Sequence, residues 1–94
     1  MNALCLHPRD NVVTTIQPVE KGEKVIWADG EVVVLEAIPA CHKVAIRNLE
    51  ADEAVLKYGE TIGKTTMAIA RGAWVSDRNI IGSHRDYDEE FVKE

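Results

Sequence analysis

Residues 38–63, IPACHKVAIRNLEADEAVLKYGETIG, are the stretch that decides the fold. A short turn with adjacent His42 and Lys43 comes first, apolar residues follow at alternate positions from Val44, and a Lys-Tyr-Gly segment at 57–59 comes near the end. Alternation at every second position is typical of a half-buried β-strand. Polar residues in turns between such strands indicate a rigid β-scaffold that presents a polar site. We therefore expect both strands and candidate site residues in this stretch.

A seven-residue pattern occurs four times along the chain, and two of its copies begin inside this stretch. An apolar residue is followed three positions later by a turn residue, and a valine follows after another three. The four copies are Val19/Gly22/Val25, Ile38/Cys41/Val44, Leu49/Asp52/Val55 and Ile69/Gly72/Val75. Glycine adopts positive φ without a Cβ clash, and aspartate tolerates it. The unequal spacing of the copies indicates short strands returned by tight turns, not a solenoid of fixed period. The alternative is a chance pattern in a valine-rich chain.

The remaining segments also favour strands. Further strands are expected at residues 12–16, 25–27 and 32–35 and from residue 74 onward. Asp29-Gly30 predicts a hairpin, because both residues tolerate positive φ at its tip. Residues 65–70 are expected to form one helical turn. Together these features predict a mostly all-β fold with short strands, tight turns and at most one or two short helical turns.

The length of 94 residues permits one domain with one binding site, but a complete catalytic apparatus is harder to fit. We therefore expect a partner chain. The composition changes beyond Asn79, and five of the last nine residues are acidic. The predicted organisation is a domain over residues 1–82 and an acidic C-terminal tail over residues 83–94, which is either frayed or a short docking helix.

The composition excludes several classes of partner. A net charge of −5 and a pI near 5.1 argue against nucleic acid and against an anionic membrane surface. No segment approaches the roughly 18 apolar residues of a membrane span, and the opening MNALCL lacks the basic region of a signal peptide. Cys5 and Cys41 have neither metal-ligand nor CxxC spacing, which suggests free thiols in a reducing compartment. A cytoplasmic protein is expected.

Three groups of residues are candidates for chemistry. His7, Asp10 and Asn11 can share a metal or a sugar hydroxyl if a turn brings them together, although a surface turn with an Asx cap explains them equally simply. His42 and Lys43 can bind a carboxylate, with the histidine as acid or base. The alternative for that pair is a solvated lysine beside a packed histidine.

Lys57 and Tyr58, followed by Gly59, are the third group. The tyrosine hydroxyl can donate to a substrate oxygen, although a half-buried strand tyrosine is common. Trp27 and Trp74 are assigned to the core. The Gly-Lys-Thr-Thr string at 63–66 is not a phosphate loop, because the upstream glycine is missing.

Four segments taken together resemble the amino-terminal SAF domain of altronate and galactarate dehydratases. They are HPRDNV at 7–12, CHKVA at 41–45, VLKYGETIG at 55–63 and IARGAWV at 69–75. The resemblance implies a SAF-type β-clip fold, a large catalytic subunit as partner, and elimination of water from a sugar acid with a divalent metal, iron or manganese, in the assembled enzyme. Two departures stand out: Cys41 replaces the usual glycine, and residues 75–79 lack the histidines of altronate-type members.

The resemblance also implies roles for the candidate residues. His7 and His42 would be catalytic, with His7 also a metal ligand, and Asp10, Asn11, Lys43 and Tyr58 would bind substrate. We expect His7, His42 and Lys43 to converge on one face that the large subunit completes. The leading hypothesis is the small subunit of a sugar-acid dehydratase. The alternatives are the small subunit of a sulfolactate sulfo-lyase, and a stand-alone SAF module for carbohydrate binding or assembly.

Overall fold

The computed structural model describes residues 1–82, which form nine short strands in three antiparallel sheets and no helix. The central sheet has the order β1-β2-β5-β8, β3 and β4 form a hairpin, and the third sheet has the order β6-β7-β9. The strands are β1 (Ala3–Leu4), β2 (Val12–Thr15), β3 (Lys24–Trp27), β4 (Gly30–Val33), β5 (Lys43–Ala45), β6 (Ala54–Lys57), β7 (Glu60–Thr65), β8 (Trp74–Val75) and β9 (Ile80–Gly82). The predicted all-β fold is confirmed, and the predicted acidic tail at 83–94 lies outside the described residues.

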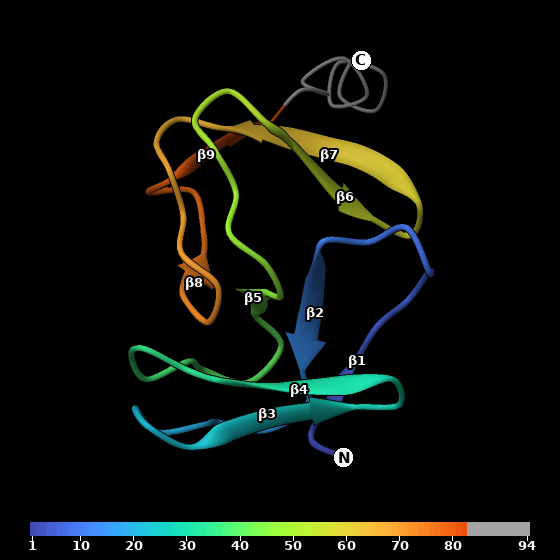
Figure 1. The fold of residues 1–94 in the computed structure, drawn as a ribbon, viewed down its shortest axis with the longest axis vertical. Helices are drawn as coiled ribbons and strands as arrows, with labels where there is room; N and C mark the ends of the chain where they lie inside the picture. Colours follow the sequence, from blue (N-terminus) through green and yellow to red (C-terminus); the bar gives the residue numbers. More distant parts are fainter. Residues whose placement is uncertain (83–94) are drawn as a thin grey trace, which may run out of the picture.

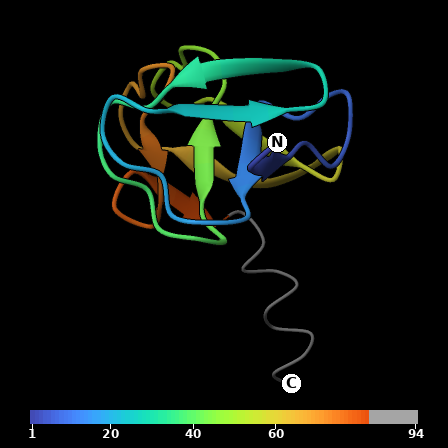
Figure 2. The same cartoon turned by 90° about the horizontal axis from the view of Figure 1, so that it is seen from below.

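The central sheet lies between the other two, as Figure 1 shows along the long axis and Figure 2 from below. Alternate residues of its strands point to opposite sides, so neighbouring residues enter different cores. Val13 and Val44 pack with the β3–β4 hairpin, while Val12 and Ala45 pack with residues of the third sheet. The fold therefore has two small cores that share one sheet.

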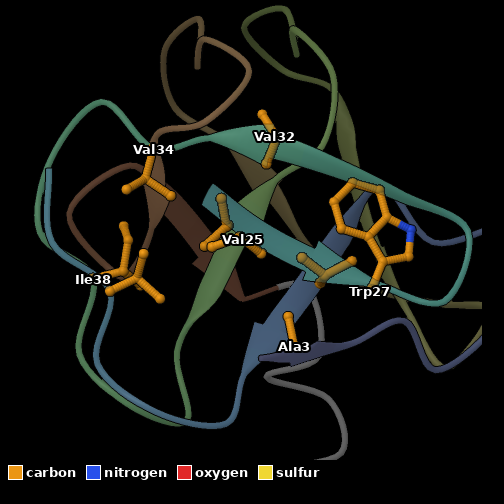
Figure 3. Packing of buried hydrophobic residues seen from close by; sticks show 9 residues of the cluster. Ala3, Val25, Trp27, Val32, Val34 and Ile38 are labelled. Carbon is orange, nitrogen blue, oxygen red and sulfur yellow. The ribbon is translucent and has the colours of Figure 1, made fainter. Parts of the chain in front are cut away.

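The first core is built from the inward face of the hairpin. Val25, Trp27 and Val32 belong to one cluster with Ala3 and Val13. Figure 3 shows Val25, Trp27 and Val32 of the hairpin together with Ala3. Trp27 is assigned to the core correctly, with 9% of its surface exposed. The second core contains Val12, Ala45, Leu49, Val55, Ile69 and Val75.

The four copies of the sequence pattern are four structural turns. The apolar residues pair across isolated antiparallel bridges, Val19 with Ile38 and Leu49 with Ile69. All four valines are completely buried. The turn residues all have positive φ: Gly22 at 87°, Cys41 at 67°, Asp52 at 66° and Gly72 at 92°. The pattern is therefore the framework of the fold and not a chance feature of composition.

A residue four positions before each apolar residue fastens the turn of the paired copy. These clip residues are Thr15, Val34, Ala45 and Thr65, and all four are buried. Each clip residue exchanges two backbone hydrogen bonds with its turn: its carbonyl accepts from the left-handed residue, and its N–H donates to the carbonyl of the next residue. Thr15 and Val34 join turns within residues 15–44, whereas Ala45 and Thr65 join turns within residues 45–75.

The two clip threonines also use their side chains. The Thr15 hydroxyl donates to the Pro39 carbonyl at 2.7 Å and accepts from the His42 N–H at 3.1 Å. The Thr65 hydroxyl makes the equivalent pair of bonds, to the Glu50 carbonyl and from the Glu53 N–H. Among the four turns of the pattern, those at Cys41 and Asp52 have a non-glycine residue at positive φ, and these are the two that a threonine hydroxyl also supports.

Two expectations about local structure are wrong. Residues 65–70 form no helical turn, because Thr65 ends β7 as a clip residue and Ile69 bonds Leu49 across the chain. The hairpin of β3 and β4 is confirmed, but neither Asp29 nor Gly30 has positive φ. Gly30 instead makes room for Trp27, since a Cβ there would lie 3.0 Å from the indole ring.

The clip hydroxyl can be tested by replacing Thr65 with valine, which has nearly the same shape. Thr65→Val removes two part-buried hydrogen bonds, to the Glu50 carbonyl and from the Glu53 N–H, and should lower the free energy of unfolding by about 1–2 kcal/mol. Thr61→Val, at an exposed position of the same strand, should change it by less than about 0.5 kcal/mol. Urea unfolding curves measure both. Equal stability of the two variants would show that the hydroxyl does not support the turn.

Candidate functional site

Asp10 and Asn11 fasten the N-terminal segment to the β6–β7 hairpin. The two oxygens of Asp10 accept the N–H groups of Tyr58, at 2.9 Å, and Gly59, at 2.7 Å. Asn11 accepts from the Leu56 N–H and donates to the Ala54 carbonyl, at 2.8 and 2.9 Å. Both side chains are buried, with exposures of 6% and 2%. Their hydrogen-bonding groups hold the hairpin, so the structure gives them a positioning role; direct contact with substrate stays a prediction.

The β6–β7 turn has left-handed geometry at both central residues, with φ 61° at Tyr58 and 76° at Gly59. Two successive N–H groups of such a turn point to one side and bind an anion, which here is the Asp10 carboxylate. The Tyr58 side chain remains 62% exposed, and the Lys57 ammonium lies 5.4 Å from the centre of its ring. The turn thus presents a cation and a phenol to solvent.

His7 packs against the same turn. A Cβ on Gly59 would lie 2.8–2.9 Å from three atoms of the imidazole, so only glycine leaves room for the ring. His7 Nδ1 accepts the Arg9 N–H at 3.1 Å. Because Nδ1 is an acceptor, the proton of the neutral ring is on Nε2. His7 can therefore offer an N–H donor to an oxygen of a ligand.

His42 lies on the other side of the central sheet. Its Nδ1 accepts the indole N–H of Trp74 at 3.2 Å, and the two rings meet edge to face with centroids 5.2 Å apart. The Arg78 guanidinium lies 5.1 Å from the Trp74 ring centre. Trp74 is paired with Val44, which belongs to the first core. His42 therefore faces the side of the sheet on which the hairpin packs.

Lys43 points to the opposite side, with the second core. It is paired with Thr14 on β2 and with Val75 on β8. Burial of the half-buried Lys43 ammonium, and then the nearby Lys57, lower its pKa below 10.5, while Asp77 acts against this shift. A lysine that is disfavoured as a cation in the free chain is a candidate for binding an anion or for proton transfer.

The structure thus brings together part of the predicted site. His7, Tyr58 and Lys57 meet at the β6–β7 turn, and the charge of Lys57 reaches Lys43. The expected convergence of His42 with this group is wrong, because successive strand residues point to opposite faces. Lys57 belongs to the third candidate group of the sequence but was given no role there, and Thr14 was not among the candidates. A shallow pocket of about 410 Å³ lined by Glu31, Val32, Val33 and Arg71 shares no residue with this group.

Residues 1–83 match the family model of the altronate/galactarate dehydratase SAF domain. The chain belongs to this family. Among curated relatives of this SAF domain, galactarate dehydratase (L-threo-forming) of Escherichia coli K12 is 32% identical over 81% of the chain, and altronate dehydratase of Bacillus subtilis 168 is 27% identical over 79%. The chain covers only 14% and 15% of the lengths of these two enzymes.

A third relative has a size close to that of the SAF domain itself. The (2R)-sulfolactate sulfo-lyase subunit alpha of Chromohalobacter salexigens is 34% identical, and the match covers 80% of the present chain and 88% of the relative. Among the residues described for the present SAF domain, no helix is long and apolar enough to cross a membrane.

The geometry accounts for the motifs of the SAF domain. Asp10 and Asn11 of the first motif bond the backbone around the Lys-Tyr-Gly motif, whose glycine accommodates His7. In the Arg-Gly-Ala-Trp motif, a Cβ on Gly72 would meet the Val33 carbonyl. Cys41 stands where the family usually has glycine, and it is an exposed free thiol with φ 67°. The bonds from Thr15 support this left-handed position.

The residues of the SAF domain do not fit a metal centre. Within residues 1–82, no three histidine, cysteine, aspartate or glutamate side chains lie close enough together to hold a metal ion. Both oxygens of Asp10 accept backbone N–H groups, and His7 in its neutral form has its proton on Nε2. A metal bound to His7 would need its other ligands from outside residues 1–82 and a different arrangement of this ring.

The contact between His7 and Gly59 can be isolated with two glycine variants. Gly59→Ala and Gly22→Ala both place alanine at positive φ, which costs about 1–2 kcal/mol. A Cβ on Gly22 meets nothing within 4 Å, whereas one on Gly59 meets His7. Gly59→Ala should therefore lose about 1–3 kcal/mol more stability in urea unfolding, through overpacking, and should alone move the His7 ring signals in NMR spectra. Equal losses would exclude close packing of His7 on the turn.

The lowered pKa of Lys43 predicts a pH dependence of stability. As pH rises through the folded-state pKa toward 10.5, the folded chain releases this proton before the unfolded chain does, so stability should increase. Below the folded-state pKa the destabilisation is fully present. Lys43→Met should be at least as stable as the parent at pH 7 and should lack part of the alkaline increase. Urea unfolding at several pH values tests this, with Lys21→Met as the control for net charge. Parallel pH profiles of the parent and Lys43→Met would contradict it.

Proposed function

We propose that this chain is the small, SAF-domain component of a lyase that eliminates water from a sugar acid such as galactarate or altronate. The observation that carries the proposal is the family match over residues 1–83, with dehydratases among the relatives. The group of His7, Lys43, Lys57 and Tyr58 supplies the positive charge and hydrogen-bond donors that an acidic substrate requires. Such a group is needed locally because the whole chain has a net charge of −5.

We assign the catalytic centre to a large partner chain. Removal of a proton beside a carboxylate creates an enediolate, which cations and hydrogen-bond donors stabilise. In this proposal Lys43 and Tyr58 bind the substrate, and His7 acts as the catalytic donor through Nε2–H. The base and the divalent metal, iron or manganese, belong to the large chain. Asp10 and Asn11 act by holding the β6–β7 turn. His42 acts indirectly, by accepting the indole N–H of Trp74 and so fixing the position of that ring.

The sulfolactate sulfo-lyase is the second candidate. The observation that favours it is length, because the chain spans 88% of a sulfo-lyase subunit alpha and only 14–15% of the dehydratases. Identity does not separate the two candidates, at 34% for this subunit and 32% for the galactarate enzyme. Both candidates require a large partner and an acidic hydroxylated substrate in our proposal, so the site argument applies to both. Two free thiols are consistent with a reducing, cytoplasmic location.

Reconstitution with a large catalytic chain tests the proposal. The purified 94-residue chain alone should not dehydrate galactarate or altronate, whereas the pair should do so. Release of sulfite from sulfolactate by the pair would select the second candidate instead. Robust turnover by the small chain alone would contradict the division of labour. Failure of the reconstituted pair on all three substrates, with the large chain shown to be folded and metal-loaded, would leave a stand-alone binding or assembly module.

A further inference from the structure

Two lysines near the proposed site lack a carboxylate partner. The ion pairs within residues 1–82 are Lys24 with Glu31, Arg47 with Glu53, and Lys64 with Asp52. Lys43 and Lys57 form no ion pair among the described residues, although both are half-buried, and Lys57 lies near enough to Lys43 to lower its pKa after burial has done so. Asp77 is a nearby carboxylate of Lys43 but forms no ion pair with it. In an acidic chain, neighbouring cations that form no ion pair are the pattern expected where an external anion binds.

The sheet register brings a third polar group to Lys43. Thr15 and His42 form a hydrogen-bonded pair, since the Thr15 N–H donates to the His42 carbonyl, so the adjacent pair of Thr14 and Lys43 is of the non-hydrogen-bonded type. Side chains of such pairs are the closer ones, with Cα atoms about 4.5 Å apart. The Thr14 hydroxyl is the one buried side-chain oxygen or nitrogen without a hydrogen-bond partner among the described residues. Its donor is unused in this structure, and an oxygen held by Lys43 would reach it once the atoms that cover it move aside.

The charged and polar groups around Lys43 come from three parts of the chain. Lys57 approaches from β6, Asp77 follows β8, and Thr14 on β2 contributes a hydroxyl without charge. Lys57 also lies over the exposed Tyr58 ring, which keeps its ammonium on the side of the β6–β7 turn. Lys43 and Lys57 thus belong to two different sheets, and their positive charges together attract the carboxylate of a ligand.

We propose that Lys43 and Lys57, with the Thr14 hydroxyl beside them, form a subsite for one carboxylate of a hydroxy acid, and that this subsite is present in the small chain before the large chain binds. Lys57 thereby becomes a determinant of affinity for acidic over neutral ligands. This inference rests on the proposed function for the choice of ligand. The inference goes beyond the proposed function because it requires the small chain to bind the ligand without the large chain.

Binding of the carboxylate should also be linked to protons. The second cation and burial disfavour the charged form of Lys43, and a bound anion removes this penalty. At a pH between the free and bound pKa values of Lys43, the complex should therefore take up protons from the buffer. Calorimetric titrations in buffers of different ionisation enthalpy measure this uptake, which should disappear in Lys43→Met.

The direct experiment is an NMR titration of the full chain with galactarate at fixed ionic strength, with galactitol as the ligand that has the same hydroxylated carbon chain and no carboxylate. Galactarate should shift the backbone signals of residues 14, 43 and 57, and galactitol should not. Lys43→Met and Lys57→Met should each weaken galactarate binding about tenfold. Lys64→Met, which removes the exposed lysine of the Lys64–Asp52 ion pair, should leave galactarate binding unchanged. The dispersion of each spectrum verifies folding.

The outcomes separate this inference from the proposed function. Absent binding, or equal weakening by Lys43→Met and Lys64→Met, would overturn the subsite even if the reconstituted pair is active. Specific binding that depends on Lys43 and Lys57 supports it, and it does so whether or not the pair dehydrates galactarate. In an active pair, Lys57→Met should raise KM for galactarate about tenfold with little change in kcat, and an unchanged KM would contradict the inference.

Discussion

The exchange of two backbone hydrogen bonds between each clip residue and a left-handed turn is the constraint on which the structure depends. A chain of very short strands buries few residues per strand, so the path between strands must be fixed by the turns themselves. Each turn is fixed at both ends: an apolar residue bridges to its counterpart, and a valine enters a core. The clip residue binds the middle of the turn. Because its own N–H and carbonyl are paired with the turn, the clip residue can be buried without the cost of unsatisfied polar groups.

The residues of the candidate site lie on β5 and at the β6–β7 turn, and none of them is a clip residue. Successive residues at β5 point to opposite faces of the central sheet. His42 and its partner Trp74 therefore lie on the face of the first core, and Lys43 lies on the face of the second core. The β6–β7 turn adds Lys57, Tyr58 and the packed His7 on that second side. Asp10 and Asn11 then serve the site indirectly, since their four bonds determine where this turn lies. Sequence motifs that look like ligand contacts can thus be the supports of the residues that make them.

The sequence predicts the framework well because its signals are local. Positive φ at Gly22, Asp52 and Gly72, burial of the four valines, and the β3–β4 hairpin follow from residue type and spacing. The helical turn at 65–70 failed because bonds to Glu53 and Leu49, distant in sequence, override a local tendency. The site was predicted less well. Lys57 gains its importance from Lys43, which belongs to another sheet, and the pairing of His42 with Trp74 depends on the β5–β8 register. Neither relation is visible before the strands are paired.

The distribution of the clips gives the chain two folding units. Residues 15–44 and 45–75 each contain two turns that fasten one another, and each unit has its own core apart from residues contributed by the N-terminal segment and the shared sheet. Such self-contained units are the kind that open and close cooperatively below the free energy of global unfolding. Val12 and Val13 enter different cores, and Asp10 and Asn11 reach the second unit. The N-terminal motif therefore connects the two units. Ligand binding at the candidate site, which contacts this motif, can change the stability of the contact between the units.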